Sequence, residues 1–270
     1  MIEEKAYKAL VTNSIAERAN KVVPAWSIAF LLSNDDFIVA GGCLAGGEVN
    51  DIDIYPVGRP VFDRSEIEGN LDSINATCVY ESKNALSIKL ADGTKLQFCD
   101  YHKDSLLGLI SSFDFWHTQC GILYEHEEKF DGGIDNPSVK EIAYTDEWLK
   151  FKLTGETHFT SSEFPISSLI RLGKYIKREM FHGRSYIPDV LKIVNNIVNR
   201  GFKDYSDFKH QLRAVDLMNL EPEEGEAAWD LFCTCWKRGL VDSKVDPTEV
   251  AKEEESKPDE NEDYYHLLKK

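Results

Sequence analysis

The sequence has little of the features that identify membrane and secreted proteins. No apolar run in the 270 residues approaches the roughly 20 residues that a membrane-spanning helix needs. The first five residues, 1 to 5, are acidic and polar, which is not typical of a secretory signal. We therefore expect a soluble, cytoplasmic protein with no membrane partner.

The sequence also lacks any spacing of cysteines that would indicate a cross-linked or zinc-binding protein. A disulfide framework is unusual in a chain of this length, and no cysteine pair has the spacing of zinc ligands. Most of the cysteines lie in apolar stretches, so we expect buried free thiols in a reducing compartment. The six cysteines are Cys43, Cys78, Cys99, Cys120, Cys233 and Cys235.

Basic residues are scarce overall, because 31 Lys and Arg stand against 47 Asp and Glu, for a net charge of −16. Neutralising phosphates requires Lys and Arg, so the composition argues against a general nucleic-acid coat protein. The charge is unevenly spread: residues 165–215 contain 10 basic and 4 acidic residues, and residues 246–270 contain 9 acidic and 4 basic. An acidic N-terminal region is thus followed by a basic segment and an acidic tail.

Hydrophobic periodicity predicts an α/β region followed by a helical one. Strands are expected over 37–40, 51–55, 76–80, 86–90, 95–99 and 120–124. Helices are expected over 3–20, 24–32, 65–71, 105–110, 167–180, 187–199, 205–218 and 223–237. In the first helix, Ala6, Leu10, Ile15 and Ala19 are expected on one apolar face. The predicted domains are 1–145, a helical domain over 146–245, and a disordered acidic tail over 246–270.

The most informative segment is the glycine pair and the two aspartates that follow the first strand. Glycine at Gly41-Gly42 lets backbone N–H groups approach a ligand closely and form a nest for phosphate oxygens. Asp51 and Asp53 alternate with isoleucines, so on a strand both carboxylates share one face. Two adjacent carboxylates repel unless a cation lies between them, and Mg²⁺ or Mn²⁺ suits that position. The segment predicts a triphosphate cradle beside a divalent-metal site.

These residues resemble the polymerase beta nucleotidyltransferase superfamily, which includes CCA-adding enzymes, poly(A) polymerases and small antibiotic nucleotidyltransferases. The family pattern of strand, glycine pair, spacer and Asp-x-Asp corresponds to Val39-Ala40-Gly41-Gly42 and Asp51-Ile52-Asp53-Ile54. The resemblance implies an α+β fold with a mixed sheet, flanking helices and a helical C-terminal lobe. It also implies that Asp51 and Asp53 bind the metal and that Gly41-Gly42 contacts phosphate. It covers residues 37–55 closely and about 25–125 by the order of elements, and the spacer is short for the family.

The family has a third carboxylate on a neighbouring strand, and here its position is ambiguous. If the apolar residues of strand 95–99 enter the core, Gln97 lies on the catalytic face. A glutamine is a poor general base. Asp100 has the opposite parity unless a bulge or the strand end turns it round. Three options stay open: Asp100 is the base, the site works with two carboxylates, or the protein is inactive.

A basic stretch in the helical region is the second candidate. Arg171, Lys174 and Arg178 have helical spacing and share one face. The apolar residues Leu169, Leu172 and Ile176 lie mostly opposite. The resemblance implies that such a helix closes the cleft and contributes positive charge to the triphosphate. The alternative is a solvated basic surface, which is common on helices. Weaker candidates are Arg184, Lys192 and Arg200.

The leading hypothesis is an enzyme that transfers a nucleoside monophosphate from an NTP to an acceptor and releases pyrophosphate. The acceptor stays open between an RNA end, such as that of tRNA, a small molecule and a protein hydroxyl. A catalytically degenerate binding or regulatory module with the same fold is the alternative, and Gln97 is the feature that favours it. A metal-dependent phosphohydrolase normally needs more ligands, histidine especially, than this segment offers.

Overall fold

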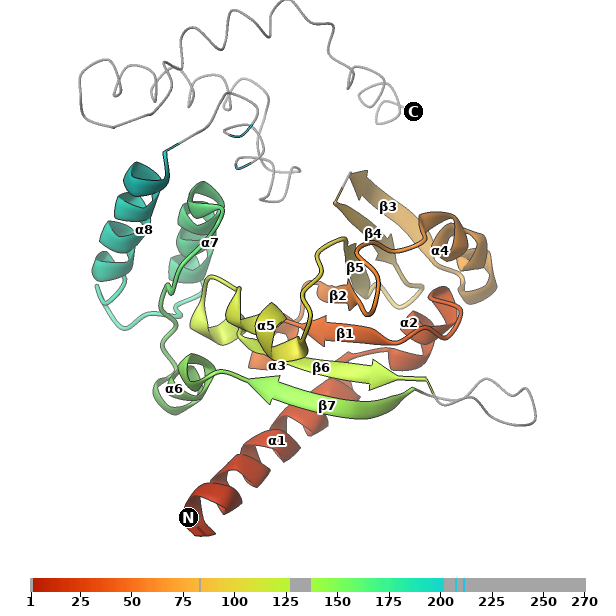
Figure 1. The fold of residues 1–270 in the computed structure, drawn as a ribbon, viewed down its shortest axis with the longest axis horizontal. Helices are drawn as coiled ribbons and strands as arrows, with labels where there is room; N and C mark the ends of the chain where they lie inside the picture. The colour runs from red at the N-terminus through yellow and green to blue at the C-terminus, as the bar shows by residue number, and fades with distance from the viewer. Residues whose placement is uncertain (1, 83, 127–136, 202–206, 208–210, 212–270) are drawn as a thin grey trace, which may run out of the picture. The chain divides into compact units, whose positions relative to one another are not determined.

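A computed structural model describes residues 2–82, 84–126, 137–201, 207 and 211 of the chain (Figure 1). Its contacts divide the chain into two units, Met1–Ser161 and Ser162–Lys270, which are described in turn. The helices expected over 205–218 and 223–237 and the tail over 246–270 lie outside the described residues. Within the described ranges, no helix combines the length and apolar character needed to cross a bilayer.

The first unit is built on a mixed sheet of seven strands in the order β3-β4-β5-β2-β1-β6-β7. Only the pairing of β2 with β5 is parallel; the other neighbours are antiparallel. The strands are β1 (Phe37–Ala40), β2 (Ile52–Pro56), β3 (Thr77–Ser82), β4 (Ala85–Lys89), β5 (Lys95–Cys99), β6 (Cys120–Glu125) and β7 (Ser138–Tyr144). The helices are α1 (Ile2–Val22), α2 (Ala25–Leu31), α3 (Gly42–Ala45), α4 (Arg64–Asn70), α5 (Leu106–Ser111) and α6 (Asp146–Thr154), with short 3₁₀ turns η1 (Asp72–Ile74) and η2 (Trp116–Thr118). An α+β fold with a mixed sheet and flanking helices is therefore confirmed.

All six expected strands are present, and the structure adds a seventh, β7, which the sequence had not predicted. The strand β7 lies at the edge of the sheet and is half-buried or exposed throughout. Its sequence therefore lacks a clear alternation of apolar and polar residues, because neither face is strongly buried. The helix α6 starts at Thr145, whose hydroxyl accepts the N–H of Trp148 at 3.1 Å, and belongs to the first unit.

One face of the sheet packs against α1, α2 and α4. The apolar side chains of β1 and β2 that enter this face, including Val39, Ile52 and Ile54, are completely buried. On α1, Ile15 and Ala19 join this core. The expected apolar face of the first helix is wrong in its N-terminal half, because Ala6 and Leu10 are exposed where α1 runs past the sheet (Figure 1).

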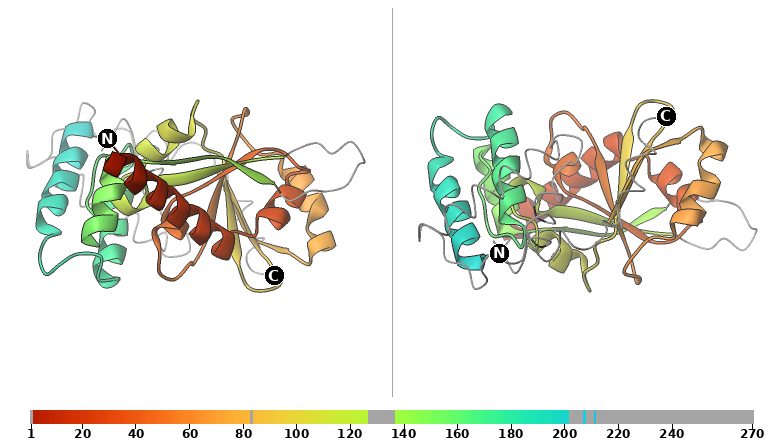
Figure 2. Two further views of the ribbon diagram at one scale, coloured as in Figure 1. Left: turned by 90° about the horizontal axis from the view of Figure 1, so that it is seen from below. Right: turned by 90° about the horizontal axis from the view of Figure 1, so that it is seen from above.

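The opposite face of the sheet is covered in part by α5 (Figure 2). Leu106, Leu109 and Ile110 pack there on residues of β1 and β2. The approach is close: a Cβ on Gly121 of β6 would lie 2.8 Å from Cδ1 of Leu106, so only glycine fits. Because α5 is short, the neighbouring part of this face, where the aspartates lie, stays partly open to solvent.

In the second unit, the described residues contain helices α7 (Pro165–Lys177) and α8 (Ile187–Arg200), which confirms the helices expected over 167–180 and 187–199. Pro165 is the first residue of α7, where its missing N–H costs no hydrogen bond. The α7 residue Ser167 is fully buried and its hydroxyl donates to the carbonyl of Gln211 at 2.6 Å. The two helices pack against each other.

Candidate functional site

The glycine pair forms the turn between β1 and α3. Gly41 has φ +98°, a conformation that residues with a side chain rarely adopt. Its N–H donates to the carbonyl of Cys120 at 3.0 Å, so this N–H is used by the sheet. Gly42 is exposed, and a Cβ there would meet nothing within 4 Å. Because the first N–H groups of a helix have no partner within it, the start of α3 presents N–H groups at an open surface.

The two aspartates lie beside this turn. Asp53 is opposite Ala40 in the antiparallel register of β1 and β2, and Asp51 directly precedes β2. Both are half-buried, whereas Ile52 and Ile54 are completely buried. A Cβ on Gly41 would lie 3.4 Å from Oδ2 of Asp53. The Asp53 carboxylate therefore lies directly beside the Gly41 turn.

Two thiols lie close enough to both carboxylates for their pKa values to be affected. Burial, followed by the charges of Asp53 and Asp51, raises the pKa of Cys43 on α3 to about 12, while Arg18 opposes the increase. Burial, followed by the same two aspartates, also raises the pKa of Cys99 on β5. Both carboxylates therefore lie near both thiols. The alternation of half-buried Asp51 and Asp53 with buried Ile52 and Ile54 agrees with the expectation that the two aspartates share a face.

Gln97 occupies the third position of the acidic face. The parallel register pairs Asp53 with Gln97, as strand parity predicts, and Leu96 and Phe98 enter the core. Gln97 is half-buried, and Ser87 lies opposite it on β4. We had not predicted Ser87 at this site, although the hairpin of β4 and β5 pairs it with Gln97. The face therefore presents two carboxylates, one amide and one hydroxyl on three neighbouring strands.

Asp100 is bonded to the segment that precedes α4. Its Oδ2 lies 2.6 Å from Nη2 of Arg64, and its Oδ1 accepts the N–H of Phe62 at 2.9 Å. The Asp100 side chain is only 7% exposed. Although burial disfavours the charged guanidinium, its bonds to Asp100 and Glu81 raise the pKa of Arg64. Asp100 thus fixes the end of β5 to the start of α4.

The basic candidates lie on α7, on α8 and in the segment between them, all in the second unit, so their position relative to the aspartates stays a prediction. Arg171 is half-buried and Lys174 is exposed. The helix ends three residues before the expected bound, so Arg178 is the residue after α7, and Leu169 is 37% exposed. Leu172 is buried, as expected. The weaker candidates lie as follows: Arg184 is exposed, Lys192 Nζ is 3.5 Å from Asp189, and Arg200 Nη1 is 2.9 Å from Asp207.

The donors at the acidic face suit a hard cation with few protein ligands. Among the residues that the structure describes, no group of three or more His, Cys, Asp or Glu side chains could hold a metal ion. Asp51, Asp53 and the amide oxygen of Gln97 are all oxygen donors. Mg²⁺ binds in this way, through one or two carboxylates together with water and substrate phosphates. A closed zinc site would need four nitrogen or sulfur ligands.

The sequence matches no protein-family model and no curated protein. The solved structures that are similar to it include two of CCA-adding enzymes. The Thermotoga maritima enzyme complexed with tRNA has a TM-score of 0.46 and 13% identity, covering 82% of this chain and 53% of that one. An apo form of a CCA-adding enzyme has a TM-score of 0.47 and 13% identity, and the match covers 87% of this chain and 62% of that one. The chain spans less than two thirds of either structure, and similarity at this level says nothing of its chemistry.

Proposed function

We propose that the protein is a nucleotidyltransferase, which transfers a nucleoside monophosphate from an NTP to an acceptor hydroxyl and releases pyrophosphate. The observation that supports this proposal is the position of the acidic pair beside the glycine turn. The Asp53 carboxylate lies next to Gly41, and Gly42 starts α3 at an exposed surface. A cation-binding pair and backbone N–H donors for phosphate are thus adjacent, as the binding of a metal-bound triphosphate requires.

Each residue has a role in this proposal. Asp51 and Asp53 hold Mg²⁺ or Mn²⁺, with the amide of Gln97 beside them, and the ion supplies neutralisation of phosphate charge when bound. The N–H groups at Gly42 orient phosphate oxygens. Arg171 and Lys174 of α7 add positive charge around the triphosphate. These residues bind and align the substrates, which supplies much of the catalysis in phosphoryl transfer.

The acceptor must also lose a proton, and the proposal assigns this step to the acidic pair. Asp100 is bonded to Arg64 and to the N–H of Phe62, so its carboxylate is already satisfied. Gln97 cannot accept a proton usefully. Asp51 or Asp53 is then the nearest carboxylate to an acceptor hydroxyl bound on this face. The proposed acceptor is an RNA end, a small molecule or a protein hydroxyl. The proposed location of the protein is the cytoplasm.

The direct test is label transfer. The full chain is incubated with Mg²⁺, a cell extract and each of the four NTPs in turn, labelled at the α-phosphate, and the fraction that becomes labelled is identified. Asp53→Asn should abolish transfer. The matched control is Asp72→Asn, which removes one exposed carboxylate from η1, a segment that follows α4. Equal transfer by wild type and Asp53→Asn would contradict the proposal.

A second candidate function is a nucleotide-binding module without catalysis. Gln97 at the third position and the engagement of Asp100 by Arg64 favour it, because together they leave the face one carboxylate short of the family pattern. This candidate predicts Mg²⁺-dependent nucleotide binding by calorimetry, lost in Asp53→Asn, with no label transfer to any fraction. Transfer at a measurable rate would exclude it.

A further inference from the structure

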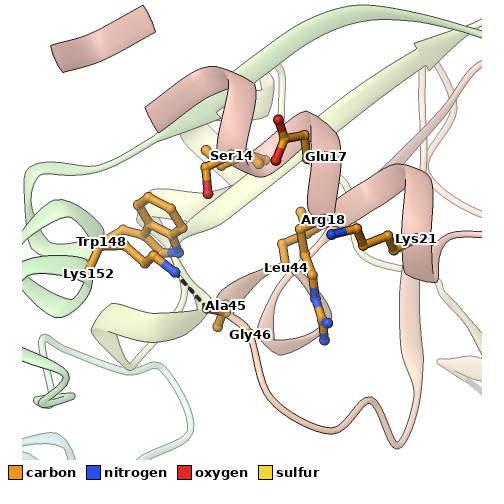
Figure 3. Close-up of a pocket in the computed structure, with 10 residues that line it drawn as sticks. Ser14, Glu17, Arg18, Lys21, Leu44, Ala45, Gly46, Trp148 and Lys152 are labelled. Carbon is orange, nitrogen blue, oxygen red and sulfur yellow. Dashed lines mark hydrogen bonds between the residues drawn. The ribbon is translucent and has the colours of Figure 1, made fainter. Parts of the chain in front are cut away.

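A second charged site lies in a pocket of about 220 Å³ between α1, the end of α3 and α6 (Figure 3). Three cationic side chains line it: Arg18 and Lys21 from α1, and Lys152 from α6. The single carboxylate at the pocket is that of exposed Glu17. Three positive side chains thus gather at one pocket in a chain whose net charge is −16, which makes this pocket a local site for an anion.

Two of these cations are held in place by backbone carbonyls around α3. Arg18 donates from Nε to the carbonyl of Cys43 at 3.1 Å and from Nη2 to that of Gly47 at 2.7 Å. Lys152 donates from Nζ to the carbonyl of Ala45 at 3.1 Å. These bonds use two of the five N–H donors of a guanidinium and one of the three of an ammonium. Fixed cations with donors to spare lose little conformational entropy when an anion binds.

Trp148 provides an independent indication of a ligand. Its side chain is 1% exposed, and its Nε1 is buried with no hydrogen-bond partner among the described residues. Trp148 lines the pocket, and Figure 3 shows the indole nitrogen on the pocket side of the ring. A buried donor is normally paired, because an unpaired one keeps the full cost of its lost hydration. An acceptor atom inside the pocket would satisfy it.

We propose that this pocket binds a small phosphate-bearing anion, either inorganic phosphate or a phosphomonoester. The lining groups are donors from two helices: the indole of Trp148, the hydroxyl of Ser14, and the cations Arg18, Lys21 and Lys152. A tetrahedral group with several oxygens can accept from donors that converge from several directions, and guanidinium and ammonium groups both suit it. The volume suits a small anion better than a drug-sized ligand, which needs about 300 Å³ or more.

The test measures phosphate binding to the full chain by calorimetry at constant ionic strength, with chloride and acetate as reference anions. Lys21→Gln, which removes an exposed charge, should weaken phosphate binding about three- to fivefold. Trp148→Phe keeps the ring and removes the N–H, and should weaken it about tenfold. Lys8→Gln is the matched control, since it removes one exposed lysine of α1 outside the pocket. Its affinity should equal that of wild type.

The same titration with glycerol phosphate distinguishes a site for phosphomonoesters from one for inorganic phosphate. Tighter binding of either ligand supports the site. Thermal melts cannot replace calorimetry, because phosphate stabilises proteins generally by exclusion from their surface. Should Trp148→Phe fail to fold, Lys21→Gln combined with Lys152→Gln replaces it, because both lysines are exposed. Wild-type affinity in these variants, or acetate binding as tight as phosphate, would overturn the proposal.

Discussion

The sharpest prediction concerns Asp100, which sequence reasoning considered as a catalytic base and the structure bonds to Arg64. Asp100→Asn keeps an oxygen for the N–H of Phe62 but removes the charge that faces Arg64 at 2.6 Å. Breaking a buried ion pair costs about 3–5 kcal/mol. The Arg64 side chain is 22% exposed and keeps Glu81 as a partner at 2.8 Å. We therefore expect the free energy of unfolding to fall by about 2–3 kcal/mol, below that range.

The assay is urea denaturation of the full chain followed by circular dichroism, with the slope of the transition compared between variants. Glu81→Gln is the control on the same arginine. Its side chain is 38% exposed, so its loss should cost about 0–1 kcal/mol. Asp51→Asn and Asp53→Asn should cost little or even stabilise the fold, since each relieves repulsion between two carboxylates.

The opposite pattern of stability and activity in the same variants would contradict a structural role for Asp100. A loss of less than about 1 kcal/mol in Asp100→Asn, together with abolished label transfer, would show that the carboxylate serves the chemistry and that the ion pair is dispensable. A large loss of stability with the remaining folded protein still active would confirm a structural role.

Three further predictions concern other parts of the molecule. Gln97→Asp should tighten Mg²⁺ binding about tenfold in calorimetry, because it places a third carboxylate beside Asp53; unchanged affinity would remove β5 from the site. Arg171→Glu combined with Lys174→Glu should weaken NTP binding at least tenfold with an unchanged urea midpoint, and unchanged affinity would make α7 a solvated surface. At pH 8, peptide mapping after brief alkylation should find Cys78 modified and Cys43 protected. Partial burial raises the pKa of Cys78 too, but this thiol is exposed to the reagent. Burial raises the pKa of Cys43 to about 12 and leaves almost no thiolate, and the reverse order of modification would contradict the burial of Cys43.

The thiols also show where composition misleads. The sequence predicts buried cysteines, and Cys43 and Cys120 are buried, but Cys78 is exposed and Cys99 is half-buried. Cys78 lies on β3, an edge strand whose residues are mostly exposed on both faces. An apolar residue type predicts a preference for the core, yet it is the position of the strand in the sheet that decides the exposure of a given side chain.

The sequence by itself determined the local geometry of the acidic face. Asp51 and Asp53 share a face because the period of a strand is two residues, and the turn at Gly41 follows from a backbone conformation that favours glycine. The same period, applied to strand 95–99, placed Gln97 on the open side. These features depend on residues close together in the chain, so pattern and propensity are enough to predict them.

Only the tertiary structure decided which partners those residues meet. Asp100 and Arg64 are 36 positions apart, and Lys152 reaches the carbonyl of Ala45 across 107 positions. Such contacts arise from strand order and helix packing, and no periodicity in the sequence specifies them. The weakly patterned edge strand β7 escaped prediction for a related reason, since it is defined by its pairing with β6 rather than by its own residues.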